Sequence, residues 1–107
     1  MLNRSKMIVL ENMQNPDFTI TMFAEEIGIS VSMLNRKMKA LIGITPNDFI
    51  KHLRIIKASE LLNSKSFNVS EVAHQCGFND ISYFGVCFKK QYGVSPSNYV
   101  ENRSGKS

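Results

Sequence analysis

No long uncharged apolar run occurs in this 107-residue chain, and none approaches the roughly 20 residues that a membrane-spanning helix needs. The first residues, MLNRSKMIVLENM, carry charged and amide side chains among the apolar ones, so they do not resemble a secretion signal. We therefore expect a soluble, cytoplasmic protein without membrane contact. Because 43% of the residues are hydrophobic, we expect one compact domain, or two small subdomains that share an element.

Cysteine is scarce: Cys76 and Cys87 are the two in the chain, both in apolar surroundings. They could pair, but a reduced, buried role is favoured in a chain without an export signal. The two histidines, His52 and His74, form no H-x-x-x-H spacing, and no C-x-x-C is present, so no metal site is predicted. No phosphate loop and no pairing of a nucleophile with a base is recognisable either. We expect no catalytic residue, no metal and no cofactor, and therefore not an enzyme.

Two segments of the chain are similar to each other. Residues 18–50 read FTITMFAEEIGISVSMLNRKMKALIGITPNDFI, and residues 67–100 read FNVSEVAHQCGFNDISYFGVCFKKQYGVSPSNYV. The shared positions are Phe18 and Phe67, Ala24 and Ala73, Gly28 and Gly77, Gly43 and Gly93, and Pro46 and Pro96. The offset is 49 residues at first and 50 later, so the second copy has one extra residue near Asn79. A duplication of this size indicates one task at two sites, or one extended site read in two steps.

Positive charge recurs at matching places in the two copies. The net charge is +4 overall, but residues 29–57 have a net charge of +5 and residues 89–107 of +3, whereas residues 1–28 and 58–88 have −2 each. This distribution favours a polyanionic partner. A contribution to solubility alone is the alternative.

Most apolar residues follow a helical spacing, which predicts an all-α fold of seven helices. The expected helices include residues 7–13, 21–27, 32–42, 46–63, 70–76 and 80–92, with a last helix that begins at Pro96. Their expected N-caps are Thr21, Ser30 or Ser32, Thr45 and Ser70, and their expected ends are Gly28, Gly43, Gly77 and Gly93. The inward faces are expected to include Met7, Ile8, Leu10 and Met13, then Phe23, Ala24 and Ile27, then Leu34, Met38 and Leu41.

Each copy has the order of a helix-turn-helix: a short helix, a turn that opens on glycine, and a second helix of about ten residues. The small side chains Ala24 and Ala73 allow the two helices to cross closely, and Ile29 and Phe78 would fill the space between them. In the first copy the second helix exposes a polar side, Ser32, Asn35, Arg36 and Lys39, opposite its apolar side. Such a helix can pack with one face and enter a major groove with the other. An ordinary amphipathic surface helix is the alternative.

The second copy, VSEVAHQCGFNDISYFGVCFKKQYGVSPSNYV at residues 69–100, closely resembles the signature of the AraC/XylS family of transcription regulators. The segment FIKHLRIIKASELL, residues 49–62, is similar to that family's linker helix. The resemblance covers about residues 5–101. It implies two helix-turn-helix subdomains, residues 5–46 and 65–101, joined by a linker helix at residues 47–64 and followed by a tail at residues 102–107.

The resemblance also implies the function: sequence-specific binding of double-stranded DNA for transcription regulation, with two recognition helices in successive major-groove segments. RNA polymerase is an implied partner. A regulatory or receiver domain is expected elsewhere in the full-length protein, as in the output domains of two-component response regulators. A helical protein-interaction module without DNA readout is the alternative.

Carried onto this sequence, the first recognition helix covers about residues 31–41. Its base-facing positions are Ser32, Asn35 and Arg36, and its phosphate-facing lysines are Lys37 and Lys39. Arginine can donate two hydrogen bonds to guanine, and asparagine can pair with adenine. We therefore expect direct base recognition by this helix.

The second recognition helix covers about residues 81–91, with Ile81, Ser82, Gly85 and Val86 at the matching positions. Ile81 or Val86 could contact a thymine methyl group, and Gly85 could permit close backbone approach. Because three of the four lack hydrogen-bonding side chains, we expect mainly phosphate contacts here, through Ser82, Lys89 and Lys90. Near the helix starts, Ser30, Asn79 and Asp80 could orient main-chain amides toward phosphate.

Five aromatic residues of the second copy, Tyr83, Phe84, Phe88, Tyr92 and Tyr99, could stack on single-stranded nucleic acid. Their spacing favours core packing for Phe84, Phe88 and Tyr99. The two cysteines are likewise expected to act as small core hydrophobes.

Overall fold

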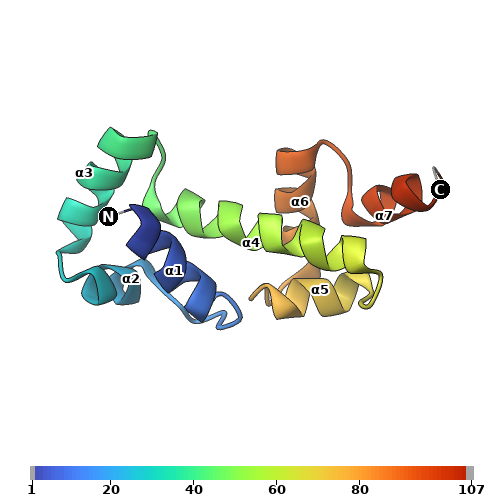
Figure 1. The fold of residues 1–107 in the computed structure, drawn as a ribbon, viewed down its shortest axis with the longest axis horizontal. Helices are drawn as coiled ribbons and strands as arrows, with labels where there is room; N and C mark the ends of the chain where they lie inside the picture. The colour runs from blue at the N-terminus through green and yellow to red at the C-terminus, as the bar shows by residue number, and fades with distance from the viewer. Residues whose placement is uncertain (1, 106–107) are drawn as a thin grey trace. The chain divides into compact units, whose positions relative to one another are not determined.

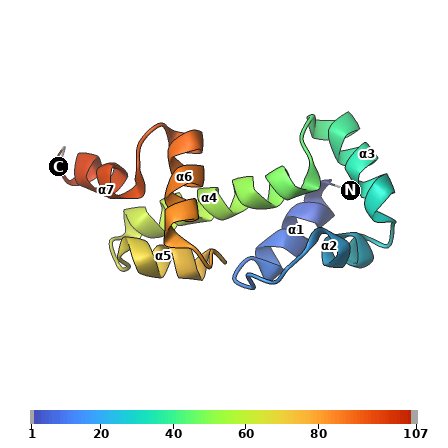
Figure 2. The ribbon, with the colours of Figure 1, turned by 180° about the vertical axis from the view of Figure 1, so that it is seen from behind.

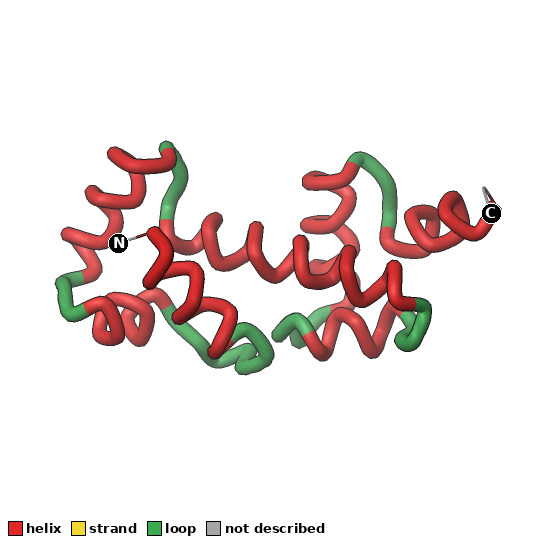
Figure 3. The backbone as a smooth tube through the Cα atoms, viewed as in Figure 1, coloured by secondary structure: helices red, strands yellow, loops and turns green. Residues whose placement is uncertain are grey.

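The structure is a computed structural model that describes residues 2–105, with side chains for residues 2–101. Within that range the chain forms seven α-helices and no strand (Figure 3). They are α1 (Leu2–Asn12), α2 (Ile20–Ile27), α3 (Val31–Ile42), α4 (Pro46–Ser64), α5 (Val69–Gln75), α6 (Ile81–Tyr92) and α7 (Pro96–Gly105) (Figure 1). The predicted all-α class and helix number are confirmed. Residues 106–107 of the predicted tail lie outside the described residues.

The chain divides into two compact units, Met1–Leu53 and Arg54–Ser107, which we call the N-terminal and C-terminal units. The division lies inside α4, so this helix contributes its first turns to one unit and the rest to the other. None of the described helices is long and apolar enough to cross a membrane.

In the N-terminal unit, α1 packs on α2 and α2 packs on α3. The fully buried side chains at its centre are Val9, Phe23, Leu34 and Met38. Phe23 contacts the ring of Phe18, with centroids 6.1 Å apart, and the ring of Phe49 from the first turn of α4, at 6.3 Å. These ring contacts therefore pack α2 against the start of α4.

Two predicted apolar faces in this unit are partly wrong. Met7 is 60% exposed and Leu10 47% exposed, because α1 packs through Ile8, Val9 and the small Ser5 on the opposite side. Leu41 is 54% exposed, since the buried row of α3 continues in steps of four residues from Met38 to the half-buried Ile42.

The start of α2 also differs from the prediction. Thr19, not Thr21, is the N-cap: its backbone is extended, and its side chain accepts a hydrogen bond from the amide of Met22 at 3.2 Å. Thr21 is already inside the helix. Of the two candidates for α3, Ser30 is the cap and accepts from the amide of Met33 at 3.1 Å. Gly28 follows α2 in the left-handed conformation, with φ 88°, as predicted.

The C-terminal unit has a larger aromatic core. It is formed by Ile55, Ala58 and Leu62 of α4, Val72 and Ala73 of α5, Cys76 and Phe78 of the turn, and Phe84 and Phe88 of α6. Ring centroids lie 5.1 Å apart for Phe78 and Phe84 and 5.3 Å apart for Phe88 and Tyr99. The predicted core packing of Phe84, Phe88 and Tyr99 is thus confirmed. Figure 2 shows α5 and α6 on this part of α4 from behind.

At the start of α5 the predicted cap, Ser70, is wrong. Asn68 caps the helix by accepting from the amide of Glu71 at 2.8 Å, and the Glu71 carboxylate accepts from the amide of Asn68 at 2.9 Å. This reciprocal pair satisfies two amides that Ser70, two residues later and already inside the helix, does not cap. The predicted cap Thr45 is confirmed by its bond from the amide of Asp48 at 3.1 Å.

Candidate nucleic-acid interface

The two helix-turn-helix copies have the same turn. The amide of Ile29 donates to the carbonyl of Ala24 at 3.1 Å, and the amide of Phe78 donates to the carbonyl of Ala73 at 2.9 Å. Both alanines are buried, which allows close packing of the helices. The left-handed glycine of the second copy is Gly77, with φ 85°, two residues beyond the end of α5.

After the turn, the second copy has its extra residue. Ser30 follows Ile29 directly as the cap of α3, whereas Asn79 separates Phe78 from Asp80, the cap of α6. From these caps α3 and α6 both run for 12 residues to a left-handed glycine. Every position of α3 therefore corresponds to the position 50 residues later in α6.

In α3 the predicted DNA-facing residues lie away from the buried Leu34 and Met38. Ser32, Arg36, Lys37 and Lys39 are exposed, and Asn35 is half-buried. The side-chain amide of Asn35 donates to the carbonyl of Val31 at 3.0 Å, so part of its hydrogen-bonding capacity is used within the helix. The exposed guanidinium of Arg36 is thus more available to a ligand than the side-chain amide of Asn35.

In α6 the packed side consists of Phe84 and Phe88. The predicted DNA-facing residues Ile81, Ser82, Val86, Lys89 and Lys90 are exposed, and Gly85 is half-buried. Arg36 of α3 corresponds to Val86 here, and Asn35 corresponds to Gly85. The two helices share a scaffold but present different chemistry.

The helix starts already have side-chain partners for their amides. The carboxylate of Asp80 accepts from the amides of Ser82 at 2.9 Å and Tyr83 at 3.3 Å. Ser30 similarly holds the amide of Met33. The exposed Asn79 has no such role in the described contacts. Phosphate binding by Ser30, Asn79 and Asp80 stays a prediction, and a capping carboxylate at Asp80 opposes it electrostatically.

The cations of the two helices are available to a polyanion. Arg36, Lys37, Lys39, Lys89 and Lys90 form no ion pair within the described part of the chain. Exposed ion pairs lie instead on α4, between Lys51 and Asp48 at 3.9 Å and between Lys57 and Glu60 at 3.8 Å. Phosphate contacts by the helix cations would therefore not require an existing pair to break.

Sequence reasoning missed the exposed apolar side chains in the first turn of α3, whereas on α6 it named Ile81 and Tyr83. Val31 is 37% exposed and Met33 38% exposed on α3, and Tyr83 is 48% exposed on α6. Tyr83 also contacts the ring of Phe78 at 6.2 Å, across the turn. The N-cap was the available signal, because its position fixes which residues of the first turn face solvent.

The cysteines have no place in this interface. Cys76 and Cys87 are both free, and Cys76 is fully buried. Burial raises the pKa of the Cys76 thiol to about 12, although Lys57 and Arg54 nearby favour the thiolate. Burial also lowers the pKa of Arg54. Cys76 is therefore an unreactive core side chain.

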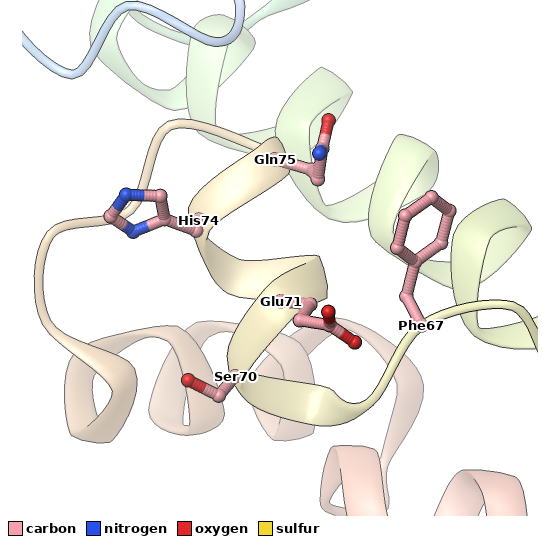
Figure 4. A pocket seen from close by; sticks show the side chains of 5 residues that line it. All are labelled: Phe67, Ser70, Glu71, His74 and Gln75. Atoms are coloured by element: carbon pink, nitrogen blue, oxygen red, sulfur yellow. The ribbon is translucent and has the colours of Figure 1, made fainter.

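A surface pocket of about 250 Å³ lies elsewhere in the C-terminal unit (Figure 4). Its lining residues are Phe67, Ser70, Glu71, His74 and Gln75. Glu71 is held by its capping bonds, and the described residues contain no group of three or more potential metal ligands. The pocket contributes none of the predicted site residues.

Comparison with known proteins identifies the arrangement. A family model described as a helix-turn-helix domain matches residues 23–102. The transcriptional activator RhaS of Escherichia coli is 33% identical over 82 residues, which are 77% of this chain and 30% of RhaS. The chain belongs to the AraC-type helix-turn-helix family. This is a family of DNA-binding domains of transcription regulators, not an enzyme family.

Two solved structures from transcription or response regulators share the fold. The C-terminal domain of the two-component response regulator yesN from Fusobacterium nucleatum has a TM-score of 0.84 and 30% identity, covering 92% of this chain and 96% of that one. The DNA-binding domain of AdpA, in complex with a target DNA, has a TM-score of 0.89 and 26% identity, covering 98% and 94%.

The chain spans only part of the curated relatives it matches. It is 38% identical over 103 residues to histidine kinase P4 of Formosa agariphila, and these residues are 96% of this chain but 7% of that protein. As an AraC-type domain, it thus matches a small portion of much longer proteins.

Proposed function

We propose that this AraC-type domain binds double-stranded DNA sequence-specifically in transcription regulation, with α3 and α6 as recognition helices in successive major-groove segments. The observation that supports this most strongly is the repeated construction: two helices of equal length, each held by the same glycine turn, each with exposed cations. Its role is binding, not catalysis.

The two helices contribute unequally in this proposal. Arg36 reads guanine and Ser32 and Asn35 contact neighbouring base edges, while Lys37 and Lys39 bind phosphates. On α6, Ser82, Lys89 and Lys90 bind phosphates. Asp80 acts as a helix cap rather than as a phosphate ligand, since its carboxylate already accepts two amide bonds.

Further partners follow from the family. RNA polymerase is proposed as the partner through which the DNA-bound domain regulates transcription. A receiver or other regulatory domain is proposed elsewhere in a longer protein, because the yesN domain is the C-terminal part of a two-component response regulator. A cytoplasmic location and the absence of membrane contact fit these partners.

The proposed function is tested by selecting bound duplexes from a random pool and titrating the recovered duplex at several salt concentrations. The four lysines on α3 and α6 correspond to about four neutralised phosphates, so log affinity should fall with log salt with a slope of about −4. The selected duplex should bind more tightly than a mixed-sequence duplex at every salt concentration.

The control duplex separates sequence preference from general attraction to a polyanion. Equal affinity for selected and mixed duplexes would contradict sequence-specific readout. No duplex binding, or binding that does not change with salt, would instead support the helical protein-interaction module.

A further inference from the structure

The exposed side of α6 is apolar near its start and middle and cationic at its end. Ile81 is 50% exposed, and Val86, at 64%, is the most exposed of the large hydrophobic side chains in the described residues. Lys89 and Lys90 follow in the last turn. Scattered apolar side chains on a surface are ordinary, but these two lie on the helix face that the proposed function directs to DNA.

Gly85 lies on the same helix, one turn after Ile81 and one turn before Lys89. The fold does not require glycine there. A methyl group at this position would meet no atom within 4 Å beyond its chain neighbours and its own helix backbone. Because glycine destabilises a helix interior relative to alanine, its presence leaves an open place on the exposed face at some loss of stability.

The corresponding places on α3 are filled differently. Asn35 stands where α6 has Gly85, and Arg36 stands where α6 has Val86. The polar side chains at these places on α3 can pair with base edges. Glycine and valine at the corresponding places on α6 have no side-chain donor or acceptor for a base. The α6 face therefore suits a different feature of the major groove.

We infer that α6 reads thymine through its C5-methyl group, with Ile81 and Val86 as the contacting side chains and Gly85 allowing the helix backbone close to the DNA. Thymine presents the one apolar group of the four bases in the major groove. Lys89 and Lys90, next to the apolar side chains, favour a phosphate-lined groove over an apolar protein surface. This inference rests on the proposed function and adds that thymine is the base contacted by α6.

Uracil replacement tests the methyl contact directly, because it removes only the methyl group and keeps every base-pair hydrogen bond. Each thymine of the selected duplex is replaced singly by uracil, and the affinity of the whole domain is measured. We expect about fourfold weaker binding for each contacted methyl group, the effect of losing one buried group of that size. Ile81→Ala or Val86→Ala should abolish the uracil effect at one position each.

Val31→Ala is the matched control, since Val31 occupies on α3 the place of Ile81. It should leave the uracil effects of the α6 half-site unchanged. If every uracil duplex binds as tightly as the thymine duplex, the inference is overturned, although sequence-specific, salt-dependent binding would still support the proposed function. The exposed Ile81 and Val86 side chains would then be better explained by contact with a protein partner.

Gly85→Ala tests the close approach, because it should move two measurements in opposite directions. Its melting temperature should rise by about 2–6 °C, while its affinity for the selected duplex should fall at least threefold. Asn63→Ala, at an exposed position of α4, should not lower the affinity. Unchanged or tighter DNA binding by Gly85→Ala would overturn the close approach of the α6 backbone.

Discussion

Ser5 and Ser59 are both buried serines, but their hydroxyl groups have different surroundings. The Ser59 hydroxyl donates to the carbonyl of Ile56 at 2.7 Å and accepts from the hydroxyl of Tyr92 at 3.0 Å. The Ser5 hydroxyl, in contrast, has no hydrogen-bond partner among the described residues. A buried hydroxyl without a partner lowers stability, whereas a satisfied one contributes modestly.

We therefore predict opposite effects of the same substitution. Ser5→Ala should raise the free energy of unfolding by about 1 kcal/mol, because it removes an unsatisfied polar group. Ser59→Ala should lower it by about 1–2 kcal/mol, because it leaves the Tyr92 hydroxyl without its acceptor. Urea denaturation of both variants measures the difference, and destabilisation by Ser5→Ala equal to that of Ser59→Ala would refute it.

At the scale of the element, the caps are where sequence and structure differ most. Each failure involved two polar residues two positions apart at a helix start: Thr19 and Thr21 for α2, and Asn68 and Ser70 for α5. Both members of each pair are good N-caps, so composition alone does not choose between them. For α5 the sequence does contain a deciding signal, because Glu71 lies three residues after Asn68, as a capping box requires.

The capping box of α5 gives a prediction at this scale. Asn68→Ala should lower the free energy of unfolding by about 1 kcal/mol, whereas Ser70→Ala should change it by less than about 0.5 kcal/mol. Thermal unfolding followed by circular dichroism provides the comparison. A larger loss for Ser70→Ala would mean that α5 begins later than the structure shows.

For the whole molecule, the duplication predicted the architecture well. Shared glycines and prolines located the turns, and the 3.6-residue spacing located Phe84 and Phe88 in the core. The side of α1 was not predictable in the same way, because Met7, Ile8, Val9 and Leu10 are all apolar and surround the helix. The two hydrogen bonds that the Asp80 carboxylate accepts were not predictable either, since they depend on the backbone geometry at the start of α6.

The predicted DNA-facing residues lie on α3, on α6 and at the starts of these two helices. Asn35 and Gly85 are half-buried, and the other predicted DNA-facing residues are exposed. What the structure adds is a physical difference between the copies: an available guanidinium at Arg36 and an isopropyl group at the corresponding Val86. The central claim is that Arg36 provides hydrogen-bonded base readout, whereas the lysines of α6 provide attachment to phosphates.

The most direct measurement of that claim compares Arg36→Ala and Lys89→Ala on the selected and mixed-sequence duplexes at one salt concentration. Arg36→Ala should reduce the affinity ratio of the two duplexes by about 5- to 150-fold, the loss expected for one good base contact. Lys89→Ala should weaken binding to both duplexes similarly and leave the ratio unchanged. Equal, sequence-independent losses from the two variants would contradict the account.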